Sequence, residues 1–242
     1  TKDVSLSVSG GNAHGNYMFS FNYYDEDGVV IGPTHQRFNV RSNSEAKKGI
    51  FTIGENFTFG RSESVPLQGS PFIDLARMPP VIPVRNPDNP DEYGYGTSSQ
   101  RTYGTNPIGL QETRNWKQYN NRFLGNAYLQ IEPLKGLQVK TNIAVEYFDY
   151  YDKYKTTYKQ LRYLSEPADK NELRENNGET LSWIWENTAF YQFKIQKHSF
   201  DALFGYSAQK TTNHGNSAHI YNLATEGYWV LNQKSEKTDL SG

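Results

Sequence analysis

Cysteine is absent from all 242 residues of the chain. This absence excludes disulfides, thiolate catalysis and cysteine-based zinc sites within the sequence. No run of about 18 apolar residues is present either, so the sequence predicts no transmembrane helix. An excess of charge is also lacking, because the net charge is only -1 at pH 7. This balance indicates no strong attraction to nucleic acid or to an acidic membrane surface.

Enzyme motifs are missing as well. The patterns G-x-S-x-G, H-E-x-x-H, G-x-G-x-x-G and the P-loop do not occur, and no two carboxylates stand out as an acid–base pair. His214 and His219 lie five residues apart, which is not the spacing of a helical zinc pair, and we interpret both as exposed loop residues. The sequence therefore predicts no enzyme, no cofactor and no metal site.

Aromatic side chains, by contrast, are abundant: they make up 14% of the residues, with 18 tyrosines. The hydrophobic share is only 36%, which suits a β protein whose apolar residues gather on one face. In NYMFSFNYYDEDGVVIG, residues 16–32, every second residue from Tyr17 to Tyr23 is aromatic, and an acidic turn at 25–28 follows. Such alternation predicts eight strands, at about 4–9, 16–24, 35–42, 50–60, 121–131, 137–149, 182–194 and 199–209.

The lengths of strands and connections indicate a membrane barrel. Several strands exceed the usual 5–6 residues and match the roughly 9–11 residues that a tilted strand needs to cross a bilayer. Short turns alternate with long connections, which is the pattern of an outer-membrane barrel with its long loops outside the cell. We expect aromatic pairs such as Tyr23–Tyr24 and Trp183–Trp185 to lie at strand ends, in the interfacial girdles.

The charges on the polar strand faces point to the same architecture. Arg41, Lys140 and Glu186 would be buried in the core of a soluble sandwich, at a high desolvation cost. In a wide, water-filled barrel they stay solvated, whereas a narrow barrel of about eight strands would have its interior packed with side chains. The apolar faces are then expected to contact outer-membrane lipid, and Glu55 interrupts the apolar face of its strand.

The long connection contains the candidate binding residues. ARMPPVIPVRNPDNPDEYGYGTSS, residues 76–99, holds five prolines that forbid a helix or a central strand. Acidic and amide side chains in the 86–92 loop offer oxygens to Ca²⁺, although they match no EF-hand spacing and a solvated turn is favoured. Aromatic residues of this region are expected either to stack on sugar rings or peptide side chains or to pack the loop onto itself: Tyr93, Tyr95, Tyr103 and Trp116.

The first third of the chain carries a family resemblance. FNYYDEDGVVIG (21–32), QRFNVRSNSEAK (36–47) and IFTIGENFTFGRSE (50–63) resemble the first barrel hairpins of SusC/RagA-type TonB-dependent transporters. In that family an aromatic strand ends in a Tyr-Asp-x-Glu/Asp-Gly turn, and an Arg-rich strand and a "GEN" strand follow. PPVIPVRNPDNPDEYGYG (79–96) is similar to the proline-rich segment that comes next.

This resemblance implies that residues 1–242 are a single segment of an all-β, antiparallel transmembrane barrel of about 22 strands. It also implies the outer membrane of a Gram-negative bacterium, a SusD-like surface lipoprotein as partner, and an oligosaccharide or oligopeptide as substrate. TonB would act through an N-terminal plug domain. Neither a plug nor a TonB box is found in the sequence, so we expect it to be part of a longer protein.

Two other functions remain open from the sequence. The first is a small, self-closed outer-membrane barrel that serves as an adhesin or structural protein. The second is a soluble, carbohydrate-binding β-sandwich. The charged polar faces and the connection of about 60 residues argue against the small barrel, and the long strands with one-sided loops argue against the sandwich.

Overall fold

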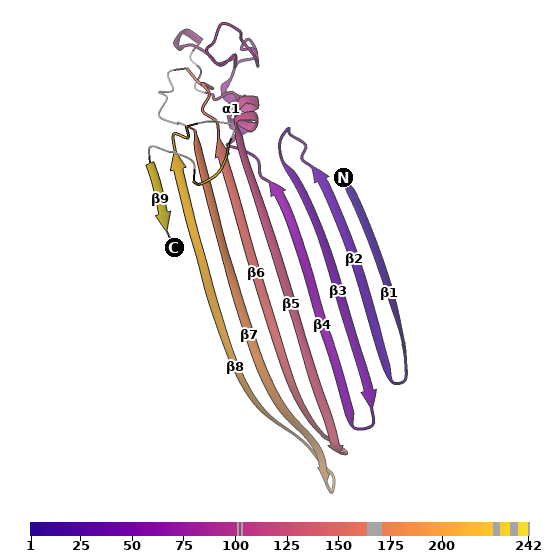
Figure 1. Cartoon of the computed structure of the whole chain (residues 1–242). Helices are drawn as coiled ribbons and strands as arrows, with labels where there is room; N and C mark the ends of the chain where they lie inside the picture. Colours follow the sequence, from indigo (N-terminus) through magenta and orange to yellow (C-terminus); the bar gives the residue numbers. More distant parts are fainter. Residues whose placement is uncertain (101, 103, 164–170, 225–227, 233–236, 242) are drawn as a thin grey trace.

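A single antiparallel sheet of nine strands, in the order of the sequence, makes up nearly the whole molecule (Figure 1). The computed structural model describes residues 1–100, 102, 104–163, 171–224, 228–232 and 237–241. The strands are β1 (Lys2–Asn12), β2 (Gly15–Asp27), β3 (Thr34–Lys48), β4 (Phe51–Val65), β5 (Arg114–Leu134), β6 (Leu137–Thr156), β7 (Glu172–Ile195), β8 (His198–Tyr221) and β9 (Lys237–Ser241).

The register places apolar side chains in continuous rows across the sheet, because residues paired across antiparallel strands point to the same face. One such row, from β1 to β7, is Leu6, Phe21, Val40, Phe59, Phe123, Tyr147 and Leu181. Nothing in the described part of the chain covers this face, and Phe204 on β8 is 73% exposed. An apolar surface of this extent is what lipid, rather than water, can solvate.

The opposite face is polar, and its side chains bond to one another across strands. Asn126 donates to Asn142 at 2.8 Å, and Asn142 donates to the Glu186 carboxylate at 3.2 Å. Arg122 and Glu146 form an ion pair at 2.6 Å on the same face. The charges predicted to lie on the polar face are therefore paired or solvated there, as the barrel interpretation requires.

Several strands are longer than the alternation predicts. β5, β6, β7 and β8 contain 21, 20, 24 and 24 residues. The alternation does not mark their outer parts, because both faces of these strands become largely polar there while the backbone pairing continues. The prediction of a turn at residues 25–28 is wrong, since β2 continues through Asp27. β8 also takes in His214 and His219, which were expected in a loop. Trp183 and Trp185 lie in the middle of β7 rather than at its end.

The open sheet decides between the architectures. In the part of the chain that the structure describes, no pairing joins β1 to β8 or β9, and no second sheet packs on the apolar face. A small self-closed barrel and a soluble sandwich are therefore both wrong. None of the described helices is long and apolar enough to cross a membrane.

Within the described residues, helices occur only in the connection between β4 and β5, at the loop end of the sheet (Figure 1). They are α1 (Pro71–Arg77), the 3₁₀ turn η1 (Ser98–Gln100) and α2 (Pro107–Thr113). Both α-helices start with proline, whose fixed φ suits the first turn and whose missing N–H is not needed there. The five prolines between residues 79 and 90 lie outside helices and strands, as predicted.

Candidate functional site

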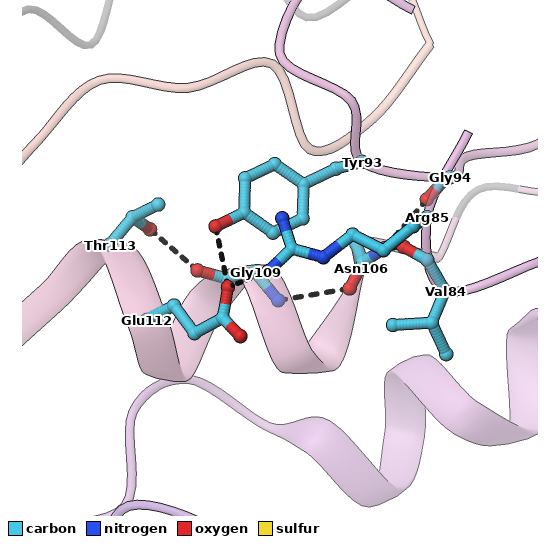
Figure 2. Close-up of polar contacts among 8 residues, drawn as sticks. All are labelled: Val84, Arg85, Tyr93, Gly94, Asn106, Gly109, Glu112 and Thr113. Carbon is cyan, nitrogen blue, oxygen red and sulfur yellow. Dashed lines mark hydrogen bonds and ion pairs between the residues drawn. The ribbon is translucent and has the colours of Figure 1, made fainter. Parts of the chain in front are cut away.

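The loop end of the sheet carries a folded layer that we call the loop platform, residues 66–113 and 157–163 within the described chain. Asn106 is its central polar residue and is 1% exposed. Its side-chain amide donates to the Val84 and Gly94 carbonyls, both at 2.8 Å, and its oxygen accepts from the Gly109 amide at 2.9 Å (Figure 2). The Asn106 side chain thus caps α2 and holds two segments of the proline-rich loop, around Val84 and Gly94, against this helix.

An ion pair fixes the same loop to the other end of α2. The Arg85 guanidinium lies 2.5 Å from the Glu112 carboxylate, and the Tyr93 hydroxyl donates to the same carboxylate at 2.7 Å (Figure 2). The Arg85 guanidinium carbon also lies 4.2 Å from the centre of the Tyr93 ring, which adds a cation–π contact. Burial, and then the hydrogen bond to Glu112, raises the pKa of Tyr93 above its ordinary value.

The apolar centre of the platform consists of Tyr93, Leu110 and Leu161. The α2 residue Gly109 makes this packing possible, since a Cβ there would lie 2.3 Å from a Leu161 methyl carbon. Tyr93 is only 7% exposed. In this arrangement its ring packs the platform together and offers little surface to a ligand.

The connection after β6 is bonded into the platform through Asp91. The Asp91 carboxylate accepts from the Gln160 backbone amide at 2.7 Å and forms an ion pair with Lys159 at 3.3 Å. The Asn106 backbone amide donates to the Leu161 carbonyl at 2.9 Å. Two connections that lie far apart in the sequence therefore form one structural unit above the ends of β5 and β6.

The remaining candidate aromatics have different environments. Tyr95 is partly buried, and burial is the main reason that its pKa is raised, with Asp91, Tyr158 and Tyr163 adding to the effect. Tyr103 lies outside the described residues. Trp116 is on β5, on the polar face of the sheet, and meets the β6 residue Tyr154 edge-on with ring centroids 6.4 Å apart. Trp116 and Tyr154 thus form an aromatic pair below the platform.

The 86–92 loop does not assemble a group of calcium ligands. The Asp91 carboxylate is already bonded to Lys159 and Gln160, and the Asn89 amide donates to the Tyr93 carbonyl. In the described part of the chain, no three histidine, aspartate or glutamate side chains lie together as a metal site would require.

Sequence reasoning missed the residues that organise the platform, Asn106, Glu112 and Leu161. The local signal for Asn106 was present, because NPIG (106–109) combines a good helix cap with proline at the first helical position. No comparable signal marks Glu112, whose partners Arg85 and Tyr93 lie 27 and 19 residues away, or Leu161, whose partners lie in another connection.

The chain resembles TonB-dependent receptors along most of its length. It is 27% identical over 237 residues to TonB-dependent receptor P3 of Formosa agariphila, which covers 92% of this chain and 23% of that protein. It is 25% identical over 219 residues to TonB-dependent receptor P26 of the same bacterium, covering 87% of this chain and 21% of the relative. The chain therefore spans less than a quarter of the length of either curated relative. No family model matches the sequence.

Solved structures show the same fold. The RagAB peptide transporter matches 99% of this chain and 28% of its own matching chain, with a TM-score of 0.77 at 22% identity. The RagAB peptide importer in the "closed-closed" state gives a TM-score of 0.74 at 21% identity. The all-β antiparallel fold and the resemblance to TonB-dependent receptors predicted from the sequence are confirmed: the nine strands have the fold of part of the RagAB structures. The relatives named here are receptors and a transporter, not enzymes.

Proposed function

We propose that the chain is part of the barrel of a TonB-dependent outer-membrane importer, and that the whole protein takes up oligosaccharides or oligopeptides. The observation that carries the proposal is the two-faced sheet with all its long connections at one end. Its apolar face would contact lipid, its polar face would line the import path, and the loop platform would meet substrate outside the cell. The chain itself would perform no enzymatic reaction.

The proposed partners are those that the resemblance to SusC/RagA-type transporters implies. TonB would supply energy through a plug domain, and a SusD-like lipoprotein would cover the mouth of the barrel on the side of the loop platform. RagAB is a peptide transporter, so a peptide substrate is supported by structural likeness. Exposed aromatics beside polar side chains also suit sugars, so the sequence and fold favour neither substrate class outright.

Within this function we propose that Trp116 and Tyr95 contact substrate, with Tyr103 as a further candidate outside the described residues. Trp116 has the best position, because it lies on the polar face directly below the platform. Tyr93 would contribute indirectly, by holding the proline-rich loop to α2.

Uptake by the full-length receptor in its outer membrane tests the proposal. Cells that carry the receptor should take up labelled oligosaccharides or oligopeptides, and uptake should stop when TonB is deleted. Trp116→Ala should weaken uptake about tenfold, which corresponds to one lost stacking contact. Trp229→Ala, in the connection between β8 and β9, is the matched control. TonB-independent uptake, or none of either substrate class, would contradict the proposal.

A further inference from the structure

A cavity of about 220 Å³ lies between the loop platform and the outer ends of β5 and β6. Three cationic residues line it: Arg114 at the start of β5, and Lys159 and Arg162 in the connection after β6. Hydroxyl groups of Thr105 and Thr157 belong to the same lining. The cavity therefore combines positive charge with hydrogen-bond donors, which is the chemistry that holds an oxyanion.

Among the residues that the structure describes, the carboxylates Asp91 and Glu172 lie near the cavity, and both are already bonded. Asp91 is shared between Lys159 and a backbone amide. Glu172, across from Thr156 on β7, accepts from the Thr156 hydroxyl at 3.1 Å and pairs with His219 at 2.8 Å. Arg114, by contrast, forms no ion pair with any residue that the structure describes. Within the described residues, the lining thus keeps the positive charge of Arg114 without a carboxylate partner.

Two lining residues of the cavity, Leu110 and Leu161, also belong to the apolar centre of the platform. They are 4% and 8% exposed. Asn106 fixes both, since its backbone amide donates to the Leu161 carbonyl and its carbonyl accepts from the Leu110 amide. A site that is formed before its ligand arrives loses less conformational entropy on binding.

The position of the cavity connects it to the polar face. Arg114 precedes Trp116 by two residues on β5, so both side chains lie on the polar face, one above the other. A ligand whose anionic group occupied the cavity would place its next unit beside the Trp116–Tyr154 pair. We propose that this cavity binds a carboxylate group of the substrate, an inference that rests on the proposed import function for the role of the ligand as cargo.

Binding of matched probes with and without a carboxylate to the purified full-length receptor tests this site at constant salt. Isothermal titration would compare D-glucuronate with D-glucose, and triglycine with triglycine amide. The probe that bears a carboxylate should bind about tenfold more tightly than its partner in at least one pair, as one charge-assisted hydrogen bond provides. A preference within the sugar pair identifies an acidic saccharide as the source, and a preference within the peptide pair identifies a peptide carboxylate.

Arg114→Gln should abolish the preference for the carboxylate, while Lys135→Gln, which removes one charge at the far end of the sheet, should leave it unchanged. Arg162→Gln, at an exposed position, should reduce the preference and serves if Arg114→Gln does not fold. Equal binding of both members of both pairs, or a preference that survives both substitutions, would overturn the site. If Arg114→Gln abolishes the preference but the wild-type receptor shows no TonB-dependent uptake, the site is supported and the import function is rejected.

Discussion

The ring of Tyr128 on β5 lies directly over Gly54 on β4, so close that a Cβ at Gly54 would be 2.5 Å from the ring. The phenol hydroxyl continues past the glycine and donates to the Glu45 carboxylate on β3. On the other side of the ring, the Lys140 ammonium lies 3.9 Å from the ring centre. Because Gly54 has no side chain, the Tyr128 ring can lie over it and contact both Glu45 on β3 and Lys140 on β6.

Gly54→Ala should therefore destabilise the barrel by about 1–3 kcal/mol, because the new methyl group displaces the ring from Glu45. The thermal unfolding of the full-length receptor, followed by heat-modifiable gel migration, measures the change. Gly205→Ala is the control, since its Cβ would meet no atom closer than 3.9 Å. In a Tyr128→Ala background the Gly54→Ala substitution should cost much less. An equal cost in both backgrounds would show that the ring is not the obstacle.

The two faces of the sheet should differ in their access to water. Val145→Cys on the apolar face should resist a charged thiol reagent in membranes, whereas Ala144→Cys on the polar face should react. The neighbouring positions share one strand and one depth, so only the direction of the side chain differs. Labelling of both variants in detergent-unfolded protein gives the reference rates. Equal labelling in membranes would contradict the assignment of the apolar face to lipid.

Asn106→Asp should loosen the loop platform without unfolding the barrel. The carboxylate can still cap α2 through Gly109, but it faces the Val84 and Gly94 carbonyls with no proton to donate. We expect a local cost of about 1–3 kcal/mol for each of these two lost bonds.

Hydrogen exchange of the region 79–113 measures the loosening caused by Asn106→Asp. Asn115→Asp adds the same charge at an exposed position on β5 and should leave the exchange rates unchanged. Unaltered exchange in Asn106→Asp would mean that the platform is held by its apolar centre alone.

The platform should also weaken at alkaline pH through Tyr93. Burial and the hydrogen bond to Glu112 raise the pKa of Tyr93 above 10.0, its ordinary value. The folded form therefore holds the phenol proton more tightly than the unfolded form. The stability that this group contributes is complete below pH 10.0 and declines as the pH rises through the folded pKa.

The difference in phenolate absorbance between the wild type and Tyr93→Phe reports the titration of Tyr93, which should occur at a higher pH than that of exposed tyrosines. Proteolysis of the 79–96 loop should increase over the same pH range. The Tyr93→Phe variant keeps the ring but cannot ionise, so its susceptibility should not change in that range. Titration of Tyr93 together with exposed tyrosines would contradict the expectation.

The strand pattern was predictable and the platform was not, for a physical reason. Alternation at period two is a local signal, and it located the eight long strands and the apolar face that Phe21, Phe59 and Phe123 share. The outer halves of β7 and β8 escaped prediction because no apolar face marks them. The Arg85–Glu112 pair and the Asp91–Lys159 pair join segments that only the folded chain brings together, so neither leaves a trace in sequence spacing.

The unequal lengths of β4 and β8 give the sheet an oblique edge at its short-turn end. β8 has 24 residues against 15 in β4, and the hairpins at this end descend steadily from β3–β4 to β7–β8, as tilted strands require. Through the register, Phe51 at the start of β4 aligns with Phe204, which lies six residues after the start of β8. The extra length of β8 therefore extends the sheet mainly toward the short turns, and it adds little on the side of the loop platform and the Arg114 cavity.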